Sequence, residues 1–243
     1  MKTAWQYIVS FIFIIQMYLM MAVLAIYYAP LAVFRRQSAY DGVHTYCRWV
    51  RWTASWMVGL KSEVRGDIPT GEVLIASKHQ SFFDIILIVS VVPEPKFIMK
   101  KELRWAPILG WFGKRIGCVP VDRGKKAAAI QQMVAGVRDP EAPPGQLIIY
   151  PQGTRVAPGV ARAYKSGVGA LYIALEQPCY PAATNVGVFW PRHGILRKPG
   201  LAVVEFLPAI APGLALPEFM SRLEDDVETA SNRLMEDDGF VAS

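Results

Sequence analysis

The first 34 residues form one long apolar stretch. No side chain between Lys2 and Arg35 is charged, and most residues from Thr3 to Phe34 are aliphatic or aromatic. Roughly 20 apolar residues in a helix cross the hydrocarbon core of a bilayer, so the stretch predicts a helix that spans the bilayer or lies obliquely in one leaflet. It exceeds the apolar region of about 7–15 residues in a signal peptide. Pro30 predicts that the helix ends at Ala29.

A second segment, residues 40–60, mixes apolar side chains with two arginines. Three tryptophans in it have the spacing i, i+3, i+7 and share one face of a helix: Trp49, Trp52 and Trp56. This face suits either the membrane–water interface or packing on the core of the rest of the chain, and the pattern leaves both open. We expect residues 1–62 to form a hydrophobic and interfacial helical membrane anchor. The pair Arg35-Arg36 favours a cytoplasmic location for the rest of the chain.

From Glu72 onward, short apolar runs alternate with helix-compatible stretches, which predicts helices packed on a sheet. We assign this α/β domain to residues 63–243. Its clearest buried strand is 147–150, because that apolar run is bounded by Pro-Gly and Pro-Gln-Gly. The other expected strands are 73–76, 97–99, 118–121, 180–188 and 201–207, and the expected helices are 84–91 and 125–137, with 103–112 helical or irregular.

The C-terminal stretch 218–238 has a net charge of −6, which leaves +12 for the rest of a chain whose total is +6. It predicts a solvated amphipathic helix, to which we assign no chemistry. Its expected inward face consists of Phe219, Leu223, Val227, Ala230 and Leu234.

Composition narrows the class of protein. Hydrophobic residues at 53% and charged residues at 19% exclude a disordered chain. Three cysteines cannot complete the pairs of a disulfide scaffold. A basic body allows nucleic acid, phosphorylated small molecules or an anionic membrane surface as partners, but no nucleic-acid recognition motif is present. We therefore expect an anionic membrane surface and no nucleic acid.

Among the three histidines, His79 is the best candidate for a catalytic base. It comes after the predicted strand 73–76, and Asp84 lies five residues later. On a regular helix residues i and i+5 point roughly 140° apart. They can meet if His79 lies in a loop and Asp84 in the first turn of the next helix. Asp84 could then fix one imidazole nitrogen and leave the other to act as a base.

Two further loops come after predicted strands and carry arginines. One is 117–123, which ends in Asp122-Arg123, and the other is 150–155, which ends in Gly153-Thr154-Arg155. Arginines beside exposed backbone N–H groups suit a phosphate, and the strand ends of α/β sheets are where ligands bind. Each arginine could instead form only a surface ion pair.

These blocks, His79-x4-Asp84, Gly117-x4-Asp122-Arg123, residues 150–155 and Pro181, occur in the order found in the glycerolipid acyltransferase family. Over about residues 70–190 the chain most resembles the bacterial 1-acyl-sn-glycerol-3-phosphate acyltransferase type. The resemblance implies a glycerol-phosphate acyltransferase-like fold, a mixed sheet flanked by helices. It also implies transfer of a fatty acyl group from acyl-CoA or acyl carrier protein to the sn-2 hydroxyl of 1-acyl-glycerol 3-phosphate, giving phosphatidic acid.

The resemblance also assigns roles. His79 would be the general base and Asp84 its orienting partner, while Pro181 would lie on the acyl-donor side. The acceptor phosphate would be held by Arg123, Arg155, Lys101, Gly153 and Thr154. No cofactor or metal is expected, and the protein would lie at the inner membrane with its catalytic domain facing the cytoplasm. The oligomeric state, the acyl-chain length and the choice between the two donors are left open.

The clear departure from the family pattern is Gln152, where relatives more often have glutamate. Glutamine loses the charge but gains an NH2 donor, so a contact of Gln152 with the acceptor would alter acceptor selectivity. An acceptor such as a lyso-ornithine lipid or glycerol 3-phosphate is therefore the main alternative.

Two interpretations outside the family are weaker. A serine hydrolase using Ser81 or Ser166 lacks a G-x-S-x-G motif. A non-enzymatic membrane-bound binding module is supported only by Gln152.

Overall fold

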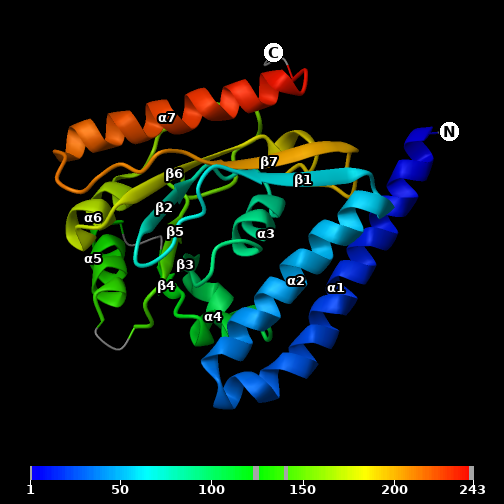
Figure 1. The fold of residues 1–243 in the computed structure, drawn as a ribbon, viewed down its shortest axis with the longest axis horizontal. Coiled ribbons are helices and arrows are strands. Elements are labelled where there is room, and N and C mark those ends of the chain that lie inside the picture. The colour runs from blue at the N-terminus through cyan, green and yellow to red at the C-terminus, as the bar shows by residue number, and fades with distance from the viewer. Residues whose placement is uncertain (1, 123–125, 140–141, 241–243) are drawn as a thin grey trace.

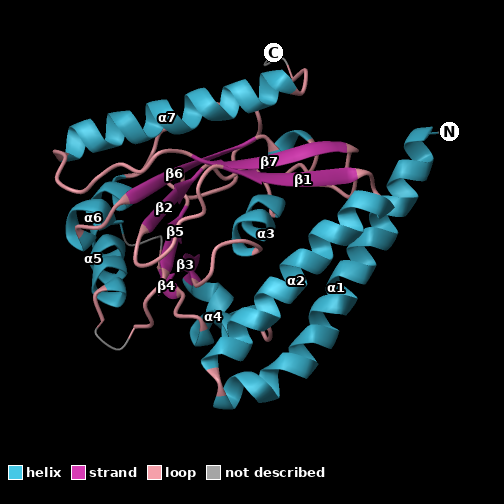
Figure 2. Cartoon of the chain, in the orientation of Figure 1, coloured by secondary structure: helices cyan, strands magenta, loops and turns pink. Residues whose placement is uncertain are grey.

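The computed structural model describes residues 2–122, 126–139 and 142–240. Two helices precede a sheet whose strands alternate with helices, and a long helix ends the chain (Figures 1 and 2). The elements are α1 (Lys2–Phe34), α2 (Arg36–Met57), β1 (Leu60–Arg65), β2 (Leu74–Ser77), α3 (Phe83–Val89), β3 (Pro95–Lys100), the 3-10 helix η1 (Lys101–Trp105), α4 (Leu109–Arg115), β4 (Val119–Val121), α5 (Lys126–Val137), β5 (Gln146–Ile149), α6 (Ser166–Leu175), β6 (Cys179–Thr184), the 3-10 helix η3 (Val186–Val188), β7 (Gly200–Phe206) and α7 (Leu216–Asp237).

The sheet is mixed, as predicted. Its strand order is β1-β7-β6-β2-β5-β3-β4. Only the β6–β7 pairing is antiparallel, so the five strands from β6 to β4 run in one direction. Their carboxyl ends therefore meet at one edge, which is where open parallel sheets place ligand sites.

Helices cover both faces of the sheet, which explains why its central strands are almost wholly apolar. Side chains alternate along a strand, so Ile75 of β2 and Ile148 of β5 face α1, α2 and α3. Leu74 and Leu147, the preceding residues, face α5, α6 and α7. All four side chains are buried.

Helices α1 and α2 lie side by side as a hairpin along one flank of the molecule (Figure 1). The prediction that the first helix ends at Ala29 is wrong, because α1 continues through Pro30 to Phe34. Ala29 packs against a cluster that includes Tyr40 and Phe112, and the Arg35 N–H donates to the Leu31 carbonyl at 2.9 Å. This packing and the closed last turn offset the hydrogen bond that a proline cannot make.

Two of the three tryptophans of α2 are exposed, while Trp49 is half-buried and its Nε1 donates to Oε1 of Gln16 in α1 at 2.8 Å. Helix α2 buries Cys47, Val50 and Ala54, whereas Trp52 and Trp56 are 56% and 61% exposed. The interpretation of these two as a stripe packed on the core is therefore wrong, and the interfacial interpretation stays a prediction. The division of the chain at residue 62 also stays a prediction. Strand β1 begins at Leu60 and runs across it.

Most predicted elements are present, with two omissions and one shortened strand. The structure adds two elements that were not predicted. Strand β1, which pairs with β7, contains a lysine, a glutamate and an arginine and so lacks an apolar run. Helix α6 contains two glycines, which are unfavourable in a helix. The strand predicted over 180–188 ends at Thr184. There Asn185 Oδ1 accepts the N–H of Val203 at 2.7 Å, and a 3-10 turn comes next. The five predicted inward residues of α7 are all buried.

Candidate active site

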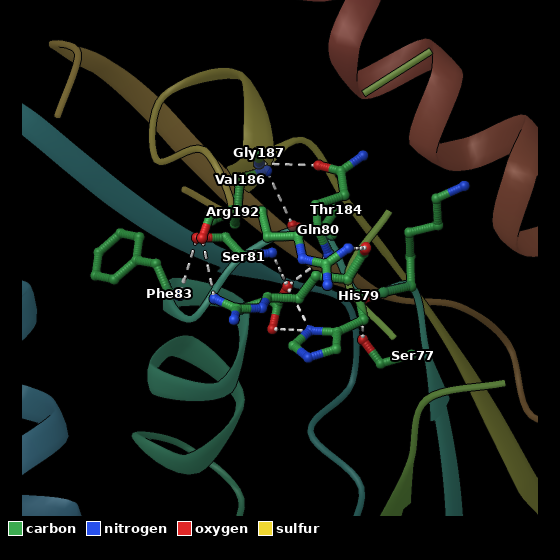
Figure 3. Close-up of polar contacts among 12 residues, drawn as sticks. Ser77, His79, Gln80, Ser81, Phe83, Thr184, Val186, Gly187 and Arg192 are labelled. Carbon is green, nitrogen blue, oxygen red and sulfur yellow. Dashed lines mark hydrogen bonds and ion pairs between the residues drawn. The ribbon is translucent and has the colours of Figure 1, made fainter. Parts of the chain in front are cut away.

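The structure brings together His79 and Asp84, as the loop-then-helix arrangement predicted. His79 lies in the loop after β2, and Asp84 lies in the first turn of α3. The His79 Nδ1 is 2.9 Å from Oδ1 and 3.1 Å from Oδ2 of Asp84 (Figure 3). The two side chains can meet because the chain between His79 and the start of α3 is not helical.

The carboxylate of Asp84 is held firmly behind the imidazole. Asp84 is fully buried, and the backbone N–H groups of Gln80 and Ser81 each donate to its Oδ2 at 2.8 Å. A carboxylate only accepts hydrogen bonds, so Nδ1 of His79 carries a hydrogen and donates it. The lone pair then lies on Nε2, which makes no hydrogen bond to the described part of the chain. With 14% of its side chain exposed, His79 can take a proton from a bound hydroxyl.

Tyr150, the residue after β5, supports the other side of the imidazole. Its ring stacks on His79 with centroids 3.9 Å apart and planes 20° apart. Its hydroxyl is buried and finds no partner within the described ranges. This burial, with the charge of Asp84 nearby, raises the pKa of Tyr150 well above its ordinary value. The neutral phenol is thus a packing platform for His79 and not a second base.

The loop after Tyr150 is tied directly to His79. The Val156 N–H donates to the His79 carbonyl at 2.8 Å, and the Gly153 N–H closes a turn onto the Tyr150 carbonyl at 2.8 Å. Gly153 has a φ of +70°, and a Cβ there would lie 2.8 Å from Nζ of Lys165. Glycine thus permits both the left-handed turn and the close approach of a lysine amine to the loop backbone.

Arg155 at the end of this loop is paired with a second arginine. Its Nη1 donates to the Arg192 carbonyl at 3.3 Å, and Nη1 of Arg192 donates to the Arg155 carbonyl at 3.2 Å. Neither guanidinium has a carboxylate partner among the residues that the structure describes. Two guanidinium groups held together in this way attract an anion.

Sequence reasoning missed Arg192, which lies in the connection after β6 (Figure 3). Gln80, next to His79, holds this connection through its Oε1, which accepts the Gly187 N–H at 2.9 Å. One signal could have found Arg192. Strand β6 runs parallel to β2, so the chain after β6 starts at the edge of the sheet that carries His79.

The remaining predicted residues lie in several neighbouring segments. Lys101 opens η1, and its Nζ lies 3.8 Å from Oδ2 of Asp122. Thr154 lies within the loop before Arg155, whereas Arg123 lies outside the described residues. Pro181 lies in β6 opposite Ala76 of β2, and its role toward the acyl donor stays a prediction. The described ranges contain no group of three or more His, Cys, Asp or Glu side chains that could hold a metal.

Gln152 is buried and contacts helix α7. Its Nε2 is 3.4 Å from Oε1 of Glu228, and its Oε1 has no hydrogen-bond partner in the described part of the chain. Lys78, the residue before His79, is also buried and forms an ion pair with Glu228. Helix α7 thus contacts the loop that carries His79 through one of its carboxylates, while the expectation that it carries no chemistry stays a prediction.

An apolar cavity of about 700 Å³ lies next to Tyr150. Its lining comes from β3, β4, β5, α5 and α6 and includes Val121, Ala129, Met133, Ile149 and Val168, with Lys165 at its polar part. This volume falls within the range of ordinary ligand pockets. Since the ring of Tyr150 both lines the cavity and stacks on His79, a chain bound in the cavity would begin beside the imidazole.

A mixed sheet with an imidazole–carboxylate pair and two arginines at its carboxyl edge is suited to base-assisted chemistry on an anionic substrate. The family model described as Acyltransferase matches residues 61–185, just over half of the chain. The protein therefore belongs to the Acyltransferase family.

Individual relatives narrow the class. A 1-acyl-sn-glycerol-3-phosphate acyltransferase of Pseudomonas aeruginosa is 29% identical over 77% of this chain and 73% of its own length. The enzyme of the same name from Limnanthes alba is 29% identical over 64% of this chain, which spans 56% of it. The crystal structure of the 1-acyl-sn-glycerophosphate acyltransferase PlsC from Thermotoga maritima superimposes with a TM-score of 0.76 at 18% identity, covering 96% of this chain and 99% of that one.

Proposed function

We propose that the protein transfers a fatty acyl group from an acyl thioester to the sn-2 hydroxyl of 1-acyl-glycerol 3-phosphate, giving phosphatidic acid. The observation that carries the proposal is the oriented His79–Asp84 pair beside Arg155 and Arg192. A base and an anion grip are the two requirements of this reaction. The names of the relatives support the same acceptor.

In the proposed mechanism, Nε2 of His79 takes the proton of the acceptor hydroxyl while the hydroxyl oxygen attacks the thioester carbonyl carbon. The tetrahedral intermediate collapses as its C–S bond breaks. The departing thiolate then takes the proton back from the imidazolium and leaves as the free thiol. Asp84 stabilises the imidazolium through the 2.9 Å contact to Nδ1. No acyl group is attached to the enzyme at any stage.

The acceptor phosphate binds to Arg155 and Arg192 in this proposal. Both are arginines of the loops joined to His79 and Gln80, so the phosphate lies close to the base. Planar guanidinium groups bind phosphate oxygens in pairs. Lys165 adds positive charge over the backbone of Gly153. Arg123 and Lys101 remain predicted contributors from the neighbouring strand ends.

The apolar cavity beside Tyr150 holds one fatty acyl chain. Acyl-CoA and acyl carrier protein both present the same thioester, so the donor is defined as an acyl thioester. This chemistry uses the side chains described above, and we propose that it needs no cofactor.

We propose that α1 lies in one leaflet of the inner membrane, with the catalytic domain on the cytoplasmic side. One face of α1 contacts the rest of the protein along the length of the helix. Near its start, Gln6 Nε2 donates to the Val58 and Arg197 carbonyls at 2.9 and 2.7 Å. Further along, Phe13 lies in the core, and Ala32 packs near α4. A helix so attached cannot cross the bilayer without drawing its neighbours into the hydrocarbon. The opposite face is apolar and exposed from Trp5 to Phe34.

A panel of acceptors and donors with the purified wild-type chain tests the function. Lysophosphatidate, lyso-ornithine lipid and glycerol 3-phosphate are each combined with acyl-CoA and acyl carrier protein thioesters, and the acylated product is measured. We expect phosphatidic acid from lysophosphatidate as the main product. Product from lyso-ornithine lipid without any from lysophosphatidate would overturn the proposed acceptor.

A further inference from the structure

One carboxylate of α7 joins two loops of the active site. Oε2 of Glu228 forms the ion pair with Nζ of Lys78. Its Oε1 accepts the Tyr164 hydroxyl at 2.9 Å and lies 3.4 Å from Nε2 of Gln152. These partners are all donors. Lys78 belongs to the loop after β2, while Gln152 and Tyr164 lie near the two ends of the loop between β5 and α6.

Each partner of Glu228 is next to a residue of the proposed chemistry. Lys78 precedes His79, and its own N–H donates to the Ala182 carbonyl of β6 at 2.9 Å. Gln152 precedes Gly153, where the arginine loop turns. Tyr164 precedes Lys165, whose amine lies against that turn.

The charges around this carboxylate balance only if residue 152 is neutral. Lys78 is 3% exposed, so its ammonium depends on Glu228 for neutralisation. Within the described residues Glu228 forms an ion pair with Lys78 alone, and Tyr164 contributes only a hydroxyl. A glutamate at position 152 would bring a second carboxylate to the place where an amide now lies 3.4 Å from Oε1. Glutamine fits because its NH2 group can donate there.

We propose that Glu228 is a positioning residue. From α7 it supplies the carboxylate that neutralises the buried Lys78 and fixes the His79 loop against the Arg155 loop, and Gln152 is neutral because Glu228 already holds that charge. This inference rests on the proposed function and adds a residue, far away in the sequence, on which it depends.

Relocating the charge tests the proposal. The variants are Gln152→Glu, Glu228→Gln and the double substitution, with Glu236→Gln as a matched control because that carboxylate is exposed on the same helix. Each is assayed well below its Tm, with the donor and acceptor pair that wild type uses best. We expect either single substitution to lower kcat/KM for the acceptor at least tenfold. Gln152→Glu brings a second carboxylate close to the one that pairs with Lys78, and Glu228→Gln leaves Lys78 without its carboxylate. The double variant again has one carboxylate there and should recover most of that loss.

Two results would overturn the positioning role. One is a double variant whose loss equals the product of the two single losses. The other is single variants with a lower Tm but wild-type kcat and acceptor KM, which would leave Glu228 a purely structural role. If the wild-type chain acylates no acceptor, the proposed function fails. The Tm values of the wild type, the two single variants and the double variant then still report whether Glu228 and Gln152 are coupled.

Discussion

At the scale of single residues, the pair formed by the half-buried Arg155 and the exposed Arg192 differs from ordinary surface arginines. Each guanidinium is held by the backbone carbonyl of the other residue. Neither guanidinium has a carboxylate partner in the described part of the chain, so an anion bound by both would supply the missing opposite charge. The acceptor phosphate is the anion that the proposed reaction supplies.

We predict that Arg192→Ala raises the KM for lysophosphatidate by about 10- to 100-fold. A charge-assisted hydrogen bond contributes about 1.5–3 kcal/mol, and each factor of ten corresponds to about 1.4 kcal/mol. The KM for the acyl donor should stay unchanged, as measured by steady-state kinetics with each substrate varied. Arg162→Ala is the control, because Arg162 is an exposed arginine in the loop after β5. Equal effects of the two substitutions would contradict the assignment of Arg192.

Parts of the site are predictable from the sequence because they are local. His79 and Asp84 are separated by five residues and bracketed by a strand end and a helix start. Lys78 and Glu228 are 150 residues apart, and Arg155 and Arg192 are 37 apart. Their pairing depends on how α7 and the chain after β6 pack on the sheet. No periodicity in one segment reveals such packing.

At the scale of elements, helices α5 and α6 close the apolar cavity over the sheet. The two sides of α5 can be told apart residue by residue. Ala129 is buried and lines the cavity, whereas the preceding Ala128 is exposed. This neighbouring pair offers a sharp test of whether the cavity holds an acyl chain.

We predict that Ala129→Phe shifts the preferred acyl chain toward shorter lengths. The added ring occupies part of the roughly 700 Å³ cavity, and a filled pocket can no longer hold the end of a long chain. The measurement is kcat/KM for thioesters of increasing chain length, compared with Ala128→Phe as the control. An unchanged length profile in Ala129→Phe would show that the acyl chain binds elsewhere.

The amphipathic pattern of α7 identified its buried face but not its role. Phe219, Leu223 and Val227 recur at helical spacing, so their burial could be predicted from the pattern. Glu228 adjoins Val227 and reads as one more acid on a solvated face. Its side chain is 27% exposed yet reaches the buried Lys78. The burial of one face of α7 could thus be predicted from its pattern, but the ion pair of Glu228, at the edge of that face, with Lys78 could not.

At the scale of the whole molecule, the apolar excess of the sequence lies mainly on the outer face of α1. The mean hydropathy alone could not separate a spanning helix from one lying in a leaflet. The polar residues of α1 favour the second arrangement, because Gln6 and Ser10 hydrogen-bond to the loop around Arg197.

We predict that both ends of α1 are accessible from the side of the membrane that carries the catalytic domain. Single cysteines are introduced as Thr3→Cys and Gln37→Cys, both at exposed positions. The proteins are reconstituted with the domain outside and treated with a membrane-impermeant maleimide, and the unsubstituted chain serves as the blank. Labelling at both positions is expected. Labelling at position 37 alone would show that α1 spans the bilayer.

The central claim is that His79 is the base for acylation of lysophosphatidate. Its most direct test is the rate of phosphatidic acid formation by wild type and His79→Ala at saturating substrates, with Tm measured for both. We predict product from wild type, an unchanged Tm, and a rate lower by about 10²- to 10⁴-fold in the variant, the loss typical of a general base. A folded His79→Ala protein that makes phosphatidic acid at the wild-type rate would contradict this role of His79.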